Sequence, residues 1–153
     1  MSKGLPAIVL CCAVALMPAC GDKDQTPTTP TPQTTNVAGT WNGQVSALGT
    51  AARMTWTLSQ TGTSVNGPVL LSLSSGLVLM NGFLTGSVSG TTLTYLISVG
   101  PGGIPLQPSC TGQITGTMAV TMGGTSTMAG TPTISSSTCS PPFPAGLLTL
   151  TKQ

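Results

Sequence analysis

The chain has 153 residues and a net charge of +2, carried by four Lys or Arg and two Asp or Glu side chains, and it has no histidine. Between residues 37 and 153 the charged side chains are Arg53 and Lys152 alone. Catalysis by proton transfer needs His, Glu or Asp, and zinc and calcium sites take Cys, His or carboxylate ligands. The composition therefore argues against an enzyme, a metal centre or a bound cofactor. Two separate cations also exclude a surface for nucleic acid.

The N-terminal residues combine one cation, Lys3, with a short apolar stretch that ends in Ala19 and Cys20. This arrangement resembles the signal peptide of a bacterial lipoprotein, in which the cysteine after the cut is acylated. The resemblance implies that residues 1–19 are removed and that Cys20 carries the acyl chains, palmitate among them. Gly21 in place of Asp then favours the outer membrane. An unacylated secretory cut and an uncleaved anchor remain alternatives, although spanning a bilayer takes about 20 apolar residues.

Residues 21–36 form a linker rich in Thr and Pro, with no large apolar side chain to bury. Its prolines favour extended backbone, at about 3 Å per residue, so we predict a disordered tether. The chain then divides into a signal peptide (1–19), the lipidated cysteine and linker (20–36), and a β domain (37–153). The last segment is long enough for a single core.

Residues 37–153 alternate apolar and polar side chains, as in Met54, Trp56 and Leu58 or in Leu93 and Tyr95. This period of two predicts antiparallel strands with one face exposed to water. The expected strands cover residues 38–46, 52–60, 64–74, 77–80, 83–89, 91–99, 111–122 and 126–134, with 146–151 as a closing strand. The predicted fold is all-β: a single antiparallel meander of about eight strands that closes as an up-and-down β-barrel, with a β-sandwich as the alternative.

Turn residues place two of the hairpins. Asn81-Gly82 suits a two-residue type I′ turn, which would join residues 77–80 to residues 83–88. Ser89-Gly90 then returns the chain into the strand that follows.

The diglycine Gly123-Gly124 marks a later hairpin. A three-residue loop over residues 123–125 opposes Val120 to Met128 and Ile114 to Ile134, which keeps both apolar rows on one face. A two-residue loop would set Val120 against a polar threonine, so we favour the longer loop.

The same register predicts a disulfide. It places Cys110 opposite Thr138, one residue from Cys139, and a β-bulge would take up that offset. Exported proteins meet oxidising conditions, and once Cys20 is acylated and the signal removed these are the two thiols left. We therefore predict a bond between Cys110 and Cys139, with two free buried cysteines as the alternative.

The segment Gly39-Thr40-Trp41 resembles the start of lipocalins and of avidin-like barrels. In lipocalins the tryptophan closes one end of the barrel, often under a basic side chain from near the C-terminus. The resemblance implies that Lys152 or Arg53 packs on Trp41, whereas a plain core aromatic is the alternative for this tryptophan. Biotin-type ligand chemistry does not carry over, because residues 37–153 contain no Asp.

Two classes of function fit these features. One is a non-catalytic binding module for a small apolar ligand, because ligand pockets are lined by apolar and aromatic side chains. The candidate lining residues are Trp41, Met54, Trp56, Phe83, Tyr95 and Met118. The other class is a structural or adhesive protein of the cell envelope that acts through strand edges. A closed barrel with a cavity would favour binding, and a filled core with an exposed edge would favour a structural role. In both classes the acyl chains on Cys20 attach the protein to the membrane, and the sequence does not identify a protein partner.

Overall fold

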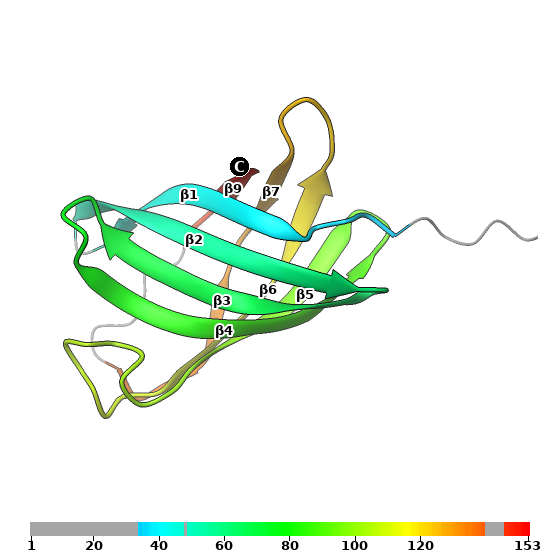
Figure 1. The fold of residues 1–153 in the computed structure, drawn as a ribbon. Coiled ribbons are helices and arrows are strands. Elements are labelled where there is room, and N and C mark those ends of the chain that lie inside the picture. Colours follow the sequence, from blue (N-terminus) through cyan, green and yellow to red (C-terminus); the bar gives the residue numbers. More distant parts are fainter. Residues whose placement is uncertain (1–33, 48, 140–145) are drawn as a thin grey trace, which may run out of the picture. The chain divides into compact units, whose positions relative to one another are not determined.

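Figure 1 shows the protein as a computed structural model, which describes residues 34–47, 49–139 and 146–153. Over these residues the chain forms nine β-strands and no helix. No helix long and apolar enough to cross a bilayer is found in this part of the chain. The predicted signal peptide, Cys20 and the linker up to residue 33 lie outside the described residues.

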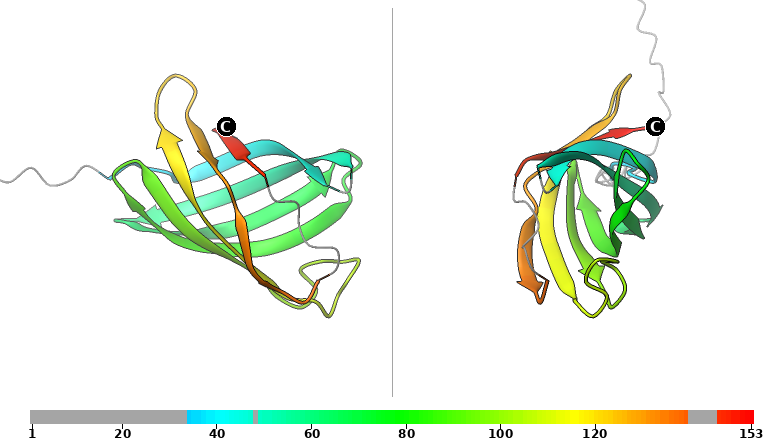
Figure 2. Two further views of the ribbon diagram at one scale, coloured as in Figure 1. Left: turned by 180° about the vertical axis from the view of Figure 1, so that it is seen from behind. Right: turned by 90° about the vertical axis from the view of Figure 1, so that its left-hand side faces the viewer.

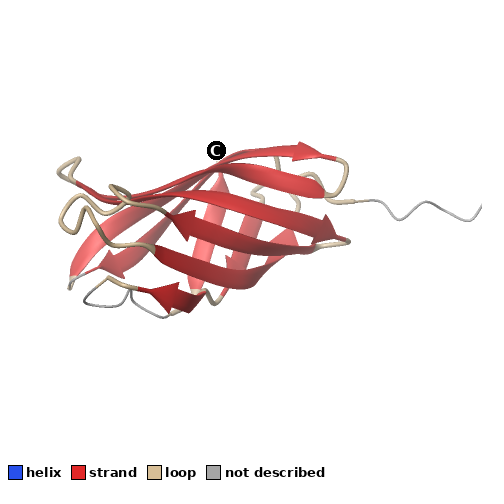
Figure 3. Ribbon diagram, turned by 90° about the horizontal axis from the view of Figure 1, so that it is seen from below, coloured by secondary structure: helices blue, strands red, loops and turns tan. Residues whose placement is uncertain are grey.

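All strand pairings are antiparallel. The strands are β1 (Gly39–Ala47), β2 (Thr50–Thr61), β3 (Ser64–Leu73), β4 (Val78–Ser89), β5 (Thr92–Val99), β6 (Gly112–Thr121), β7 (Thr127–Gly130), β8 (Thr133–Ser137) and β9 (Leu148–Lys152). Strands β1 to β7 follow one another as neighbours, and β9 lies between β7 and β1. These eight strands therefore close into a barrel (Figures 1 and 3), as predicted, and β8 is an additional strand beside β6.

Period-two alternation fills the interior of the barrel. In β3, for example, Val65, Val69 and Leu71 are buried while the residues between them are largely exposed. The same pattern recurs in β2, β5 and β6. The apolar faces of the strands point into one core, and the Thr- and Ser-rich faces point to water.

The predicted turn at Asn81-Gly82 is wrong, because β4 runs straight through both residues. The turn between β3 and β4 lies earlier, where Gly76 has a φ of +88° and the Leu73 N–H donates to the Leu77 carbonyl at 2.9 Å. Gly82 faces the barrel interior, and a Cβ there would lie 2.9 Å from Ile97 Cγ2. This glycine provides room for a neighbour rather than a turn.

The strand predicted over residues 126–134 is divided in two around Pro132, which has no N–H to donate to a ladder. Both pieces pair with β6 in the predicted register, with Val120 opposite Met128 and Ile114 opposite Ile134. Figure 2 shows the consequence from behind: β7 stays in the barrel wall beside β9, whereas β8 follows the first half of β6.

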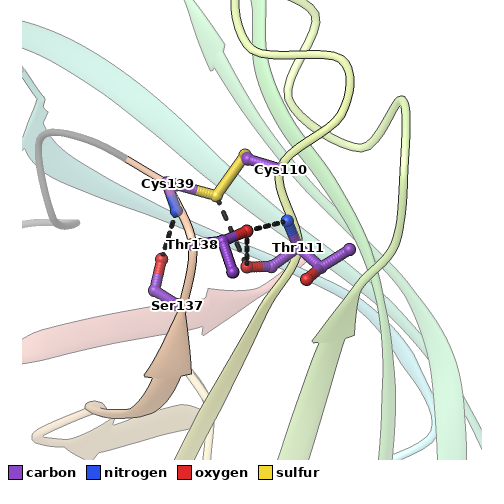
Figure 4. The surroundings of a disulfide bond; sticks show 5 residues. All are labelled: Cys110, Thr111, Ser137, Thr138 and Cys139. Carbon is purple, nitrogen blue, oxygen red and sulfur yellow. Dashed lines mark hydrogen bonds between the residues drawn. A yellow bond between two sulfur atoms is a disulfide. The ribbon is translucent and has the colours of Figure 1, made fainter.

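A β-bulge between Gln113 and Ile114 brings Cys110 and Cys139 opposite each other. The predicted disulfide is present, with the two Cα atoms 5.1 Å apart (Figure 4). Beside it the Thr111 N–H donates to Thr138 Oγ1 at 2.9 Å, and the Thr138 N–H donates to the Thr111 carbonyl at 2.9 Å. The bond therefore ties the end of β8 to the long loop that precedes β6.

Trp41 is fully buried near the start of β1. Its Nε1–H donates to the Val37 carbonyl at 2.8 Å, and Lys152 Nζ lies 5.5 Å from the ring centroid. Gly39 makes room for this lysine, because a Cβ there would lie 2.9 Å from Lys152 Cε. Of the two candidate cations, Lys152 is the one over Trp41, within cation–π distance, while Arg53 is exposed.

Candidate functional site

The two halves of the barrel differ in how completely they are filled. In the half that holds Trp41, large side chains such as Leu84, Leu93, Met118 and Leu150 have no exposed area. The other half, towards the β1–β2 turn, contains a cavity of about 240 Å³. Its walls are mainly apolar and come from β1 to β6, β8 and the residues around the start of β9: Val45, Ser46, Met54, Trp56, Leu71, Met80, Tyr95, Ile97, Ile114, Pro132, Ile134, Gly146, Leu147 and Leu148.

Trp56 and Tyr95 form the inner part of the lining, on the side towards Trp41. Trp56 pairs with Trp41 across β1 and β2, which places it near the middle of the barrel. The Trp56 and Tyr95 rings meet edge to face, with centroids 5.0 Å apart and planes at 68°. This is a favourable geometry for two aromatic side chains, so each ring fixes the position of the other.

The polar atoms of this aromatic pair are buried without a protein partner. Neither Trp56 Nε1 nor Tyr95 Oη has a hydrogen bond to any of the described residues. Burial raises the pKa of Tyr95 to about 12, so its hydroxyl is protonated at neutral pH. A buried donor without an acceptor costs about 1–3 kcal/mol. Because neither atom has accessible surface, the two residues line the cavity through the carbon atoms of their rings.

Part of the cavity lining lies at the protein surface. At this point β8 pairs with β6, and β9 pairs with β1 and β7, but the described residues show no pairing between β8 and β9. The lining includes Ile134 from β8, Ser46 from β1 and Leu147, which is 72% exposed. Leu147, just before β9, is therefore the most exposed large side chain of the lining.

The structure divides the six predicted lining residues into three groups. Met54, Trp56 and Tyr95 line the cavity. Trp41 and Met118 are fully buried but are not in the lining.

Phe83 requires a correction, because its side chain is 50% exposed. Gly82 and Leu84 take the inward positions of β4, and the alternation of the strand turns Phe83 outward. Leu84 and Val88 set the phase of this strand, and an aromatic side chain by itself does not indicate an inward position.

Several lining residues were absent from the predicted set, among them Leu71, Met80 and Ile134. Alternation in the sequence marks such residues as inward-facing, but it does so equally for residues of the filled half. Alternation therefore distinguishes inward-facing from outward-facing side chains. It does not show which inward-facing side chains line the cavity, because that depends on their position along the barrel axis.

The chemistry of the cavity is that of an uncharged apolar container, since its lining includes no Asp, Glu, Lys or Arg. Within the described residues no cluster of three or more His, Cys, Asp or Glu side chains offers a metal site. Comparisons with protein-family models, with curated proteins and with solved structures find no match to this chain.

Proposed function

We propose that this chain is an exported bacterial lipoprotein whose barrel is a non-catalytic binding module for a small apolar ligand. The observation that carries the binding role is the apolar cavity in one half of an otherwise filled barrel. Unfilled apolar space loses the dispersion contacts that a packed core would make. A ligand of matching shape would restore these contacts and remove its own apolar surface from water.

The cavity volume limits the size of the ligand. Apolar cavities of about 150 Å³ hold a benzene-sized molecule, and drug-sized ligands occupy pockets of about 300–1,000 Å³. At about 240 Å³ this cavity falls between the two ranges. We therefore expect a ligand with one ring, or a short branched chain, rather than a long lipid.

The proposed anchor is a set of acyl chains on Cys20, after removal of residues 1–19. The domain offers no cationic patch for a charged membrane surface, because residues 37–153 carry Arg53 and Lys152 alone. Attachment to the membrane would then depend on the acyl chains, and several chains hold far better than one. The linker would extend the barrel from the outer membrane.

Intact mass spectrometry of protein extracted from membranes with mild detergent tests both parts of this proposal. The expected denatured mass begins at Cys20, includes acyl chains and lacks the two hydrogens of the disulfide. The native mass should exceed it by one small molecule that is lost on denaturation. A product that is unacylated or begins at Met1 contradicts the anchor. A native mass without an added molecule, together with failure to take up small aromatic probes, contradicts the binding role.

A structural or adhesive role is the second candidate, and β8 favours it. The outer edge of this strand has no partner strand among the described residues, and Thr133, Ser135 and Ser136 are exposed. Such an edge can pair with another chain. Self-association of the purified protein in analytical ultracentrifugation, without bound ligand, would support this role over ligand binding.

A further inference from the structure

A second hollow of the barrel lies apart from the apolar cavity and contains a positive charge. It has a volume of about 350 Å³, and its lining comes from β1, β2, β3 and the turn after β3, with Gln44, Arg53, Ser72, Ser74 and Gly76 among the residues. No described residue lines both this hollow and the apolar cavity. A cation among polar side chains favours a ligand of a different chemical kind from an apolar molecule.

The strand register places the polar side chains of this hollow next to one another. Arg53 of β2 lies directly opposite Gln44 of β1 on one side and opposite Ser72 of β3 on the other. Side chains opposite each other in a sheet have Cβ atoms about 4.5–5.5 Å apart. The adjacent residues Met54 and Leu71 line the apolar cavity, so alternation turns this row to the outer face. An amide and a hydroxyl therefore flank the guanidinium on the outside of the barrel.

The polar atoms of this row are accessible to a ligand. Gln44 and Arg53 are exposed and Ser72 is partly exposed. None of these three side chains has a hydrogen bond or an ion pair with a described residue. Among the described residues, the buried polar atoms without a partner belong to Trp56 and Tyr95, so Ser72 Oγ has accessible surface. The donors of the row are thus free for a molecule in the hollow.

The charge of Arg53 has no counterpart within the domain. Residues 37–153 contain no Asp or Glu, and the two carboxylates of the chain, Asp22 and Asp24, lie outside the described residues. A guanidinium has several N–H donors, accepts no hydrogen bond and stays charged. Its planar fork fits two neighbouring oxygens of a carboxylate or a phosphate. The ligand that complements this hollow is therefore an oxyanion.

The number of donors favours phosphate over carboxylate. A carboxylate has two oxygens, and the fork of Arg53 takes both. A phosphate monoester has a third terminal oxygen and a charge of roughly −1.5 to −2 at pH 7. The Gln44 amide and the hydroxyls of Ser72 and Ser74 line the same hollow and provide donors for that oxygen. These donors would have no acceptor on a carboxylate already held by the guanidinium.

We propose that this hollow binds a phosphate monoester, carried either by a soluble molecule or by a lipid headgroup. Arg53 pairs with two of the phosphate oxygens, and Gln44, Ser72 and Ser74 donate to the remaining one. The site goes beyond the proposed function, because it shares no described lining residue with the apolar cavity. Its loss would leave that function in place.

The test measures dissociation constants of glycerol 3-phosphate and of acetate by NMR titration of the full-length chain. Ionic strength is held constant, because salt screens exposed charges. Arg53→Gln should weaken glycerol 3-phosphate binding about tenfold, the loss of a charge-assisted pair. Arg53→Lys keeps the charge without the fork, so it should restore only part of this affinity. These substitutions lie on the outer face, and the variants should fold as the wild type does.

The serine hydroxyls separate phosphate from other oxyanions. Ser74→Ala should weaken glycerol 3-phosphate by about threefold, the effect of one hydrogen bond, and leave acetate unchanged. Ser75→Ala is the matched control, because this exposed serine belongs to the same turn but not to the lining. Acetate binding as tightly as glycerol 3-phosphate, or a ratio of the two constants that Ser74→Ala does not change, overturns the phosphate assignment.

Vesicles distinguish the two sources of the phosphate. Phosphatidylcholine vesicles are prepared with phosphatidic acid, a monoester, or with phosphatidylglycerol, a diester. Comparison of the wild type with Arg53→Gln cancels any contribution of residues 1–19. A preference of the wild type for phosphatidic acid that Arg53→Gln removes supports a lipid headgroup, whereas binding of glycerol 3-phosphate alone supports a soluble ester.

Two outcomes overturn the site itself. One is the absence of binding to either source, or binding that Arg53→Gln leaves unchanged. The other is binding that appears only in the double variant Asp22→Asn, Asp24→Asn, because the linker carboxylates would then be the partners of Arg53. Neither outcome affects the uptake of apolar probes by the cavity, so the two proposals are tested separately.

Discussion

Tyr95 is the core residue whose side chain combines good packing with an unsatisfied polar atom. Its ring completes the core against Trp56, while its hydroxyl has no partner among the described residues. Because removing an unsatisfied buried group costs little, we expect Tyr95→Phe to leave the free energy of unfolding of the unliganded protein unchanged or to raise it by about 1 kcal/mol. Urea unfolding at neutral pH measures this difference. A loss of more than about 1 kcal/mol would mean that the hydroxyl is already bonded.

The same residue gives the protein a stability that depends on alkaline pH. The pKa of Tyr95 is raised by burial to about 12, above the ordinary value of 10.0. The folded state therefore holds the proton more tightly than the unfolded chain does. The stability contribution is complete below pH 10 and is lost as the pH rises to about 12, by about 2–3 kcal/mol in all.

Urea unfolding of the wild type and of Tyr95→Phe across pH 8–12 tests this dependence. The wild type should lose more stability than the variant above pH 10, and Lys152, which both proteins share, cancels in the comparison. Parallel curves for the two proteins would show that Tyr95 titrates normally.

Among the strands, β6 and β7 show how glycine permits close approach in the barrel wall. A Cβ on Gly130 would collide with the Thr117 carbonyl oxygen and lie 2.9 Å from Met118 Sδ. We expect Gly130→Ala to destabilise the fold by about 1–3 kcal/mol or more, the usual cost of overpacking. Gly124→Ala is the matched control, because a Cβ there meets nothing within 4 Å. Equal stability of the two variants by urea unfolding would contradict this account.

The disulfide also stabilises the arrangement of individual strands, because it joins the end of β8 to the loop before β6. It joins residues 29 positions apart, a separation for which chain-entropy estimates give about 3–4 kcal/mol. The double variant Cys110→Ser, Cys139→Ser should lose about this amount in urea unfolding. Reduced wild type provides the control and should match the double variant. If the variant is as stable as oxidised wild type, the bond does not constrain the fold.

The sequence predicts the fold well where alternation and turn length act together. Val120 and Met128 are paired as expected, and so are Cys110 and Cys139, because one buried face fixes the register of a hairpin. The turn predicted at Asn81-Gly82 was wrong because a glycine can indicate either a turn or close packing. Only the positions of the neighbouring strands distinguish the two. Of the six predicted lining residues, Met54, Trp56 and Tyr95 line the cavity. The others could not be sorted from the sequence, because the position of the empty volume along the barrel axis depends on the packing of the whole core.

At the scale of the whole molecule, the barrel is closed and filled at one end and hollow at the other. Trp41, with Lys152 over its ring, belongs to the filled end, and the cavity lies in the half towards the β1–β2 turn. This asymmetry fits a proposed container held near a membrane by a lipid anchor. The proposal depends on the cavity taking up a ligand rather than remaining a packing defect.

Ligand uptake by the cavity can be tested by making the same Leu→Phe substitution on the two faces of β3, at Leu71 and at Leu70. Leu71 is 3% exposed and lines the cavity, whereas Leu70 is 37% exposed. Leu71→Phe places extra volume in the cavity, so it should avoid the overpacking cost of about 1–3 kcal/mol that a filled core would impose. Leu70→Phe adds the same atoms outside.

The most direct measurement is the dissociation constant of acetophenone for the wild type, Leu71→Phe and Leu70→Phe, by NMR titration of the full-length chain. A binding cavity predicts that Leu71→Phe stays folded but loses affinity at least about tenfold, while Leu70→Phe binds as the wild type does. Unchanged binding by folded Leu71→Phe, or no binding by any of the three proteins, would contradict the proposal that this barrel carries its ligand in the cavity.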